Sequence, residues 1–320
     1  MPHEGSAKRL MRLWDIFKIQ VLRSLGKLRR WAIGPYGVAV LNRTENGLLL
    51  APAGDLMVGR RLSFNGRYDP DLLDLLLKRC ESTSQVLFVG AHVGALAVPI
   101  ARKVRRVVAI EANPTTLELL RMNVALNGLK NIEVHGFAAG DRNGEESFLA
   151  GQLNSGGSGL QIGERGRWAH GYDPPEKITV QMKSLDDVFP DDCFDLIVMD
   201  IEGAEALALR GMANLLKRSH GLLVEVFEDH LRRVAKVSND EFLSLVAPFY
   251  DQAVILPEKP GWGEPVASSP YPRSAFPEMM LDCCRQRMAN VMFWRERTAA
   301  SADVVATSRK MNVPELATEN

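Results

Sequence analysis

Three carboxylates surround a glycine directly after an apolar run, in the segment Phe194-Asp-Leu-Ile-Val-Met-Asp-Ile-Glu-Gly-Ala-Glu205. The run is typical of a buried strand in a parallel sheet, and ligands of such sheets bind beyond the carboxyl ends of the strands. We therefore predict that Asp200 and Glu202 face the reaction space, on one side because side chains alternate along a strand. A carboxylate placed there can accept a proton from a reacting group. Glu205 either joins the pair or complements the dipole of the following helix.

A divalent metal ion is a weaker hypothesis for the same carboxylates. Mg²⁺ prefers oxygen ligands and normally keeps waters, and no histidine in the segment completes a tight site with Asp200, Glu202 and Glu205. The sequence therefore favours a site without metal, with Asp200 as the base and Glu202 as a second catalytic candidate.

A glycine turn forms the second candidate site. The segments Val86-Leu-Phe-Val-Gly-Ala-His-Val-Gly94 and Val107-Val-Ala-Ile-Glu-Ala-Asn-Pro114 read as strand, turn, helix, strand and acidic residue, which is the front half of a nucleotide-cofactor site. Glu111 lies about twenty residues after Gly90, which is the separation expected for a carboxylate that binds ribose hydroxyls.

The spacing of the glycines indicates which cofactor the turn would bind. The dinucleotide fingerprint G-x-G-x-x-G is absent, because the turn offers only Gly90 and Gly94 with His92 between them, so NAD is disfavoured. Gly90 and Gly94 occupy two of the glycine positions that are typical of this turn in S-adenosylmethionine methyltransferases. The alternative is that the glycines merely let a strand turn into a helix.

Composition bounds the class of protein. The chain has 320 residues, 46% apolar and 24% charged, with a formal net charge of zero, which suits one large or two small soluble globular domains and shows no bias toward nucleic acid. Its four cysteines, Cys80, Cys193, Cys283 and Cys284, lack C-x-x-C spacing, so neither a zinc site nor a disulfide framework is indicated. We expect a cytoplasmic protein, because no membrane span or signal peptide is evident. The sequence does not indicate an oligomeric state.

The N-terminal segment has the pattern of a basic amphipathic helix over residues 8–31. Its apolar residues recur at helical spacing and its basic residues lie largely on other faces: Leu10, Trp14, Phe17, Val21, Leu25 and Leu28 against Arg9, Arg12, Arg23, Lys27 and Arg30. The favoured interpretation is a helix that packs its apolar stripe on the body of the protein. The alternative is peripheral contact with an anionic membrane surface or a partner.

The remaining patterns define the order of elements. A hairpin with a turn at residues 45–47 is followed by a helix that begins near Asp69 and Asp71. Strands and helices then alternate, which predicts a parallel sheet with helices on both faces. The predicted strands cover residues 86–89, 107–110, 132–135, 194–199, 221–227 and 290–294. Two segments with little regular pattern, residues 151–176 and 258–277, are candidate lids or plain surface insertions.

Local signals indicate where two of the helices start and stop. Pro99 should distort the first helix after the glycine turn or delay its start. Asn113 is a candidate N-cap with Pro114 at the first helical position, and Gly128 lies where that helix should stop.

Taken jointly, five segments resemble the FkbM-type S-adenosylmethionine-dependent methyltransferases. They are FVGAHVG (residues 88–94), AIEANPTTLELLRMNVALNGL (109–129), AAGDRNGEE (138–146), SLDD (184–187) and DLIVMDIEGAE (195–205). The resemblance implies the α/β class I methyltransferase Rossmann-like fold, with a seven-stranded, mostly parallel sheet whose last strand is antiparallel and helices on both faces. Together with the patterns described above, this predicts a helical extension (1–34), a lead-in hairpin and helix (35–80), the methyltransferase domain (81–298) and a disordered tail (299–320).

The resemblance also implies roles for individual residues toward the cofactor S-adenosyl-L-methionine. Gly90 and Gly94 would form the turn against the methionine moiety, Glu111 would bind the ribose, and Ala138 or Asp141 would lie near the adenine. The neighbouring residues Ala91, His92, Ala112 and Asn113 are also expected to bind the cofactor. Asp200 would lie nearest the transferred methyl group. The chain departs from the family pattern at two positions, with Phe88 in place of a common Asp and His92 in place of Asn.

The implied activity is methyl transfer, most often to a hydroxyl group of a small molecule, sugar or natural product, with no nucleic-acid partner. A protonated or donating His92 could meet the cofactor carboxylate in place of the missing Asp, or the imidazole is simply accommodated in the turn. The alternative function is a catalytically degenerate member of the fold that binds a partner. The intact acidic segment and Glu111 favour the enzyme.

Overall fold

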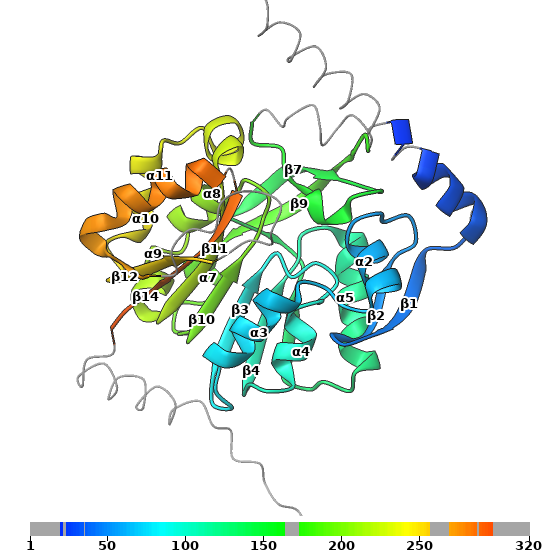
Figure 1. Ribbon diagram of the computed structural model, residues 1–320, viewed down its shortest axis with the longest axis horizontal. Coiled ribbons are helices and arrows are strands. Elements are labelled where there is room, and N and C mark those ends of the chain that lie inside the picture. Colours follow the sequence, from blue (N-terminus) through cyan, green and yellow to red (C-terminus); the bar gives the residue numbers. More distant parts are fainter. Residues whose placement is uncertain are drawn as a thin grey trace, which may run out of the picture.

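The computed structural model describes residues 20–21, 24–34, 36–163, 173–256, 269–286 and 288–296. Its centre is a sheet of eight strands in the order β13-β12-β14-β11-β10-β3-β4-β5 (Figure 1). The strands are β3 (Gln85–Val89), β4 (Arg106–Ile110), β5 (Ile132–His135), β10 (Leu196–Met199), β11 (Gly221–Phe227), β12 (Gln252–Ile255), β13 (Tyr271–Pro272) and β14 (Met288–Trp294). Adjacent strands from β5 to β11 run parallel, so their carboxyl ends share one edge.

The class I methyltransferase fold is confirmed, with one more strand than the predicted seven. β14 is antiparallel to both of its neighbours, as predicted for the last strand. The eighth strand, β13, pairs only two residues with β12 at the sheet edge. It lies within the second candidate lid, residues 258–277, and is too short to leave a periodic pattern in the sequence.

Helices cover both faces of this sheet (Figure 1). On one face, α3 (Pro70–Arg79), α4 (Ala97–Ala101) and α5 (Pro114–Leu126) share an apolar cluster with the strands. On the other face, α7 (Leu185–Val188), α8 (Glu205–Arg210), α9 (Ala213–Arg218), α10 (Asn239–Val246) and α11 (Phe276–Gln286) enclose a second cluster. The π-helix η2 (His230–Ala235) follows β11.

A second sheet of four strands, which the sequence analysis did not predict, lies beside the main one. Its order is β6-β9-β7-β8, with bounds Ala138–Gly140, Glu176–Ser184, Gly144–Ala150 and Gly159–Leu160. Charged residues interrupt both β7, which is exposed at Gly144 and Glu145, and β9, which exposes alternate side chains from Thr179 to Lys183. The 3₁₀ turn η1 (Ser155–Gly157) and β8 occupy part of the first candidate lid, and residues 164–172 of that segment lie outside the described residues.

The lead-in contains the predicted hairpin, β1 (Ala39–Thr44) and β2 (Gly47–Pro52), and the unpredicted helix α2 (Val58–Asn65). Asn123 of α5 joins this hairpin to the glycine turn. Its side-chain amide donates to the carbonyls of Leu50 (2.9 Å) and Val93 (2.8 Å), and its Oδ1 accepts from the Leu50 N–H (2.6 Å). Asn123 is fully buried, so these bonds replace all contact with water.

Two local signals in the sequence position the glycine turn. Pro99 lies at the third residue of α4, where a backbone N–H has no partner within the helix, and α4 starts late, at Ala97. Asn113 caps α5 by accepting from the Thr115 N–H (3.1 Å), with Pro114 at the first helical position. The helix ends at Leu126, and Gly128 adopts a φ of 64° just beyond it.

The expectation that the N-terminal helix packs through its apolar stripe is wrong for the part that is described. Residues 24–33 are helical, yet Leu25, Leu28 and Trp31 are 47%, 59% and 80% exposed. The helix instead meets the body through Gly26, whose missing side chain leaves room for Leu153, and through Arg29, whose Nε donates to the Ala53 carbonyl (2.6 Å). Residues 1–19 and the predicted tail after residue 298 lie outside the described residues. No helix in the described ranges is long and apolar enough to cross a membrane.

Candidate active site

The glycine turn brings the ends of three strands together. Gly90, directly after β3, has a φ of 87°, and its N–H and that of Ala91 donate to the Ile110 carbonyl at the end of β4 (3.0 and 2.9 Å). A Cβ at Gly90 would lie 1.9 Å from the carbonyl oxygen of Asp200, at the end of β10. Only glycine satisfies both the positive φ and this close approach.

Glu111 holds the turn against the start of α5. Its Oε2 accepts from the His92 N–H (2.8 Å), and its Oε1 accepts from the Asn113 N–H (2.8 Å) and the Thr116 hydroxyl (2.9 Å). Each carboxylate oxygen can accept two hydrogen bonds, so Oε2 retains capacity for one further donor such as a ribose hydroxyl. The carboxylate therefore has a structural role and remains able to bind a ligand.

His92 connects the turn to the first candidate lid. Its backbone has a φ of 51°, and its Nε2 lies 2.8 Å from the Ser155 hydroxyl. That hydroxyl donates to Oδ2 of Asp55, which also accepts from the Ser155 N–H (3.1 Å). Because an ionised Asp55 can only accept, the Ser155 proton points to Asp55, and the Ser155 oxygen must accept from a protonated Nε2 of His92. The sequence analysis singled out His92 but missed Asp55 and Ser155.

Asp200 follows β10 and lies at the shared edge of the strands. Its N–H donates to the Val89 carbonyl (3.0 Å), so the residue is fixed beside the glycine turn. Asp200 is accessible to solvent, while the protein on its other sides desolvates the carboxylate. This desolvation, with the negative charges of Glu205, Asp69 and Glu111, raises the pKa of Asp200 to about 7.

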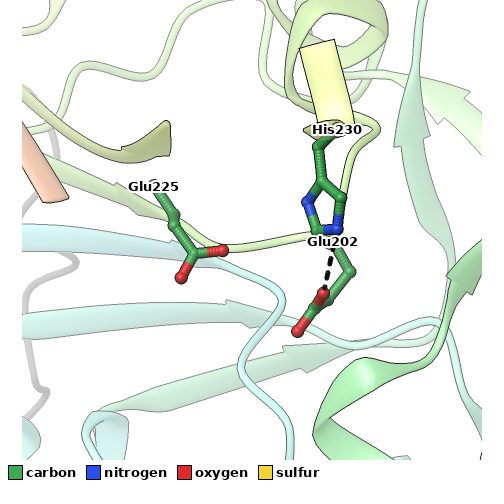
Figure 2. A group of neighbouring side chains, drawn as sticks. All are labelled: Glu202, Glu225 and His230. Carbon is green, nitrogen blue, oxygen red and sulfur yellow. Dashed lines mark ion pairs between the residues drawn. The ribbon is translucent and has the colours of Figure 1, made fainter. Parts of the chain in front are cut away.

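The two glutamates that follow have separate roles. Glu205 is buried, and its Oε1 accepts from the N–H groups of Ile201 (3.2 Å) and Gly203 (3.1 Å), so it closes the turn before α8. Strand alternation does not extend to Glu202, because β10 ends at Met199 and Glu202 adopts a φ of 55°. Its side chain instead lies beside His230, with Nε2 to Oε2 at 3.7 Å (Figure 2).

Tyr68 is a site residue that the sequence analysis missed. It directly precedes Asp69, the N-cap of α3, and its ring is half-buried. Desolvation and the nearby charges of Asp200, Asp69 and Glu225 raise the pKa of its hydroxyl well above the usual value, so the phenol remains protonated. The only sequence signal was the position of Tyr68 next to a helix cap.

The predicted adenine region lies where β6 begins. Ala138 is buried, and Ala112, just after Glu111, packs against the same small apolar cluster. Asp141 follows β6 and is ion-paired with Arg142 (3.0 Å). The structure thus brings Ala112 and Ala138 together, while the Asp141 carboxylate is engaged by a neighbouring cation.

A hollow of about 520 Å³ lies at the opposite edge of the sheet, where β3 and β4 begin. It is lined by Gln85, Arg105, Arg106 and Asp192. Because it is at the amino ends of the strands, it is not part of the candidate site.

Comparison with known families gives a match to the methyltransferase FkbM domain over residues 89–250. This range begins in β3 and includes the glycine turn, Glu111, the acidic segment and the whole of β11. Asp55 and Tyr68 precede it.

Individual relatives are more distant. A curated protein described as a probable ribosomal RNA small subunit methyltransferase A, from Methanosphaera stadtmanae, is 31% identical over 74 residues, which are 22% of this chain and 27% of that protein. The solved structure of a methyltransferase FkbM from Methylobacillus flagellatus KT is 19% identical, with a TM-score of 0.41 over 67% of this chain and 44% of that one. TYW2 of M. jannaschii, in complex with AdoMet, is 12% identical, with a TM-score of 0.40 over 81% of this chain and 87% of that one.

Proposed function

The chain belongs to the FkbM methyltransferase family, and from this membership we propose that it uses S-adenosyl-L-methionine to methylate a hydroxyl group of a small molecule or sugar. The observation that carries the proposal is the meeting of Gly90, Glu111 and Asp200 at the carboxyl ends of three adjacent strands. Ligands of open α/β sheets bind at this edge.

The residues present fit the cofactor. Glu111 retains one acceptor position on Oε2 for a ribose hydroxyl, and Gly90, which is half-buried, has a positive φ and no side chain, so a ligand could approach its backbone closely. The His92 imidazole, protonated on Nε2, is held by Ser155 beside this turn, near where the amino acid end of the ligand would lie. Ala112 and Ala138 offer an apolar surface for the adenine.

When bound, S-adenosylmethionine supplies a methyl group on a positively charged sulfur. The protein contributes alignment of the acceptor oxygen and removal of its proton. Asp200 is the proton acceptor in this proposal, because its carboxylate lies at the strand ends and is accessible. The protonated Tyr68 hydroxyl lies near enough to feel the charge of Asp200 and can donate a hydrogen bond that orients the acceptor.

A small or carbohydrate acceptor fits the charge of the chain better than a nucleic acid does. The formal net charge is zero, with 39 basic and 39 acidic residues, whereas binding a phosphate backbone relies on an excess of Lys and Arg. The chemical identity of the acceptor would be determined by the loops around the sheet.

Calorimetry with S-adenosylhomocysteine tests the proposal without knowledge of the acceptor. We expect micromolar binding by the full chain, none with NADH, and a loss of at least tenfold in affinity for Glu111→Gln. Glu118→Gln is the matched control, because Glu118 is exposed on α5. If the folded chain binds neither ligand, the degenerate, partner-binding alternative replaces the enzyme.

A further inference from the structure

Three side chains that come from separate segments meet beside the proposed acceptor site. The ligand atoms of Glu202, Glu225 and His230 all lie within 4.8 Å of one another. Figure 2 shows them directed toward one common space, with His230 next to Glu202. All three are half-buried, so the space between them is partly screened from water and remains reachable.

The fold determines the position of each member. Glu225 lies within β11, and Phe227, two residues further along, lies on the same face of the strand. The Phe227 ring contacts the His230 ring edge-on, with 4.5 Å between centroids, which fixes the imidazole at the start of η2. Glu202 is directed to the same place by the turn after β10.

This cluster adjoins the active-site residues. Met199 of β10 pairs with Val224 of the parallel strand β11, so the next residues, Asp200 and Glu225, lie at the same level on neighbouring segments. Glu202 is separated from Asp200 by one residue. The cluster therefore lies near the same edge of the sheet as Asp200.

We propose that Glu202, Glu225 and His230 form a binding site for a divalent first-row metal ion, with Mn²⁺ as the best fit. Two carboxylates and a neutral imidazole carry a formal charge of −2, which a divalent ion neutralises. Carboxylates suit Mn²⁺ and Mg²⁺, and the imidazole ligand favours Mn²⁺ over Mg²⁺. Three protein ligands leave coordination positions open, as in catalytic rather than structural sites.

The role of the ion rests on the proposed function. An ion held beside Asp200 would orient and polarise the acceptor hydroxyl, which makes its proton easier to remove. From the sequence alone a metal is the weaker hypothesis, because no histidine lies within the acidic segment. The structure supplies His230 from beyond the next strand, while Glu205, one of the ligands considered then, is bonded to backbone N–H groups.

The test is titration of the metal-stripped full chain with MnCl₂, followed by calorimetry and by loss of the electron paramagnetic resonance signal of free Mn²⁺. We expect one ion per chain, and affinity at least tenfold weaker in His230→Ala and Glu225→Gln. Glu228→Gln is the matched control, because Glu228 is exposed next to the cluster and is not a member of it. Thermal melting without metal verifies that each variant is folded.

Two results would overturn the proposal: a folded wild-type chain that binds no Mn²⁺ below millimolar concentrations, or an affinity for Mn²⁺ in both variants equal to that of the wild type. If the variants do not fold, electron spin echo modulation of the wild-type complex decides the question, since an imidazole ligand gives a nitrogen signal whose absence rejects the site. Binding of S-adenosylhomocysteine is measured separately, so failure of the metal site is distinguishable from failure of the cofactor site.

Discussion

The Nε2 atom of His92 lies 2.8 Å from the hydroxyl oxygen of Ser155 and joins the glycine turn to the first candidate lid. Ser155 is bonded in turn to Asp55 of the lead-in. His92, which stands where the family commonly has Asn, is therefore held by two segments outside the main sheet. This relationship makes the binding properties of the turn depend on contacts remote in sequence.

Replacement Ser155→Ala should weaken both stability and cofactor binding. Asp55 is fully buried and would lose a hydroxyl donor, which costs about 1–3 kcal/mol of unfolding free energy. His92 would lose its acceptor, so we expect several-fold weaker binding of S-adenosylhomocysteine by calorimetry. Ser82→Ala is the matched control at an exposed serine. Unchanged affinity in both Ser155→Ala and His92→Ala would show that His92 is only accommodated in the turn.

Replacement Asp200→Asn should abolish most turnover while leaving cofactor binding nearly intact. A general base contributes about 10²–10⁴-fold to rate, so kcat should fall by that factor once an acceptor is identified. Affinity for S-adenosylhomocysteine should change less than threefold, because the Asp200 backbone contact to Val89 is retained. Asp191→Asn, in the exposed loop before β10, serves as the control. Full turnover in Asp200→Asn would remove Asp200 from the mechanism.

Replacement Gly90→Ala should destabilise the fold by more than about 3 kcal/mol. The new Cβ would overlap the Asp200 carbonyl, in addition to the cost of about 1–2 kcal/mol for a positive φ. Gly66→Ala isolates the second contribution, because Gly66 has a φ of 64° and nothing within 4 Å of its ideal Cβ. Urea unfolding measures the loss of stability in both variants. Equal losses in the two variants would contradict the close approach of the strand ends.

The sequence predicts the strands that are continuous apolar runs, because burial on both faces leaves that pattern. β3, β4, β10, β11 and β14 were each predicted to within two residues of their observed bounds. β13 has two residues, β9 exposes alternate side chains and β7 has a single buried side chain, so their identity depends on partners that the local sequence does not reveal.

The candidate site also contains residues that local sequence patterns predict and residues that they do not. Gly90, Glu111 and Asp200 were predicted, since each lies within a local motif at a strand end. Ser155, Tyr68 and His230 were missed, because their roles come from contacts with residues far along the chain. Glu202 shows the limit of a periodicity argument, since its positive φ ends the alternation on which its predicted direction depended.

The Arg106–Glu133 ion pair should give the protein acid-dependent stability. Burial raises the pKa of Glu133, but hydrogen bonds from Arg106 (2.8 Å) and His135 (2.7 Å) outweigh that effect, so the folded-state pKa is lowered from 4.5. A lowered pKa means that the stabilisation is present above pH 4.5 and is lost as the pH falls through the folded-state value. Because the Glu133 side chain is 47% exposed, solvent screens the pair.

Replacement Glu133→Gln should therefore reduce the unfolding free energy by about 0.5 kcal/mol at pH 7 and by nothing measurable at pH 3. Urea unfolding at the two pH values gives both differences, and Glu118→Gln controls for removal of an exposed charge. A loss of stability that is equal at pH 7 and pH 3 would assign the effect to packing rather than to charge.

The exposed apolar face of the N-terminal helix predicts contact with an anionic membrane surface, which we propose for residues 8–31 in place of packing on the body. Leu25 and Leu28 lie on one helical face, and the basic residues Lys27 and Arg30 are also exposed. Such a face binds by burying apolar area while its cations approach anionic lipid headgroups.

Co-sedimentation of the full chain with vesicles containing phosphatidylserine should fall several-fold in the double variant Leu25→Glu/Leu28→Glu. The control Leu281→Glu alters an equally exposed leucine on α11, at the far side of the molecule (Figure 1). Equal sedimentation of all three proteins, or none with vesicles of any charge, would reject the membrane contact.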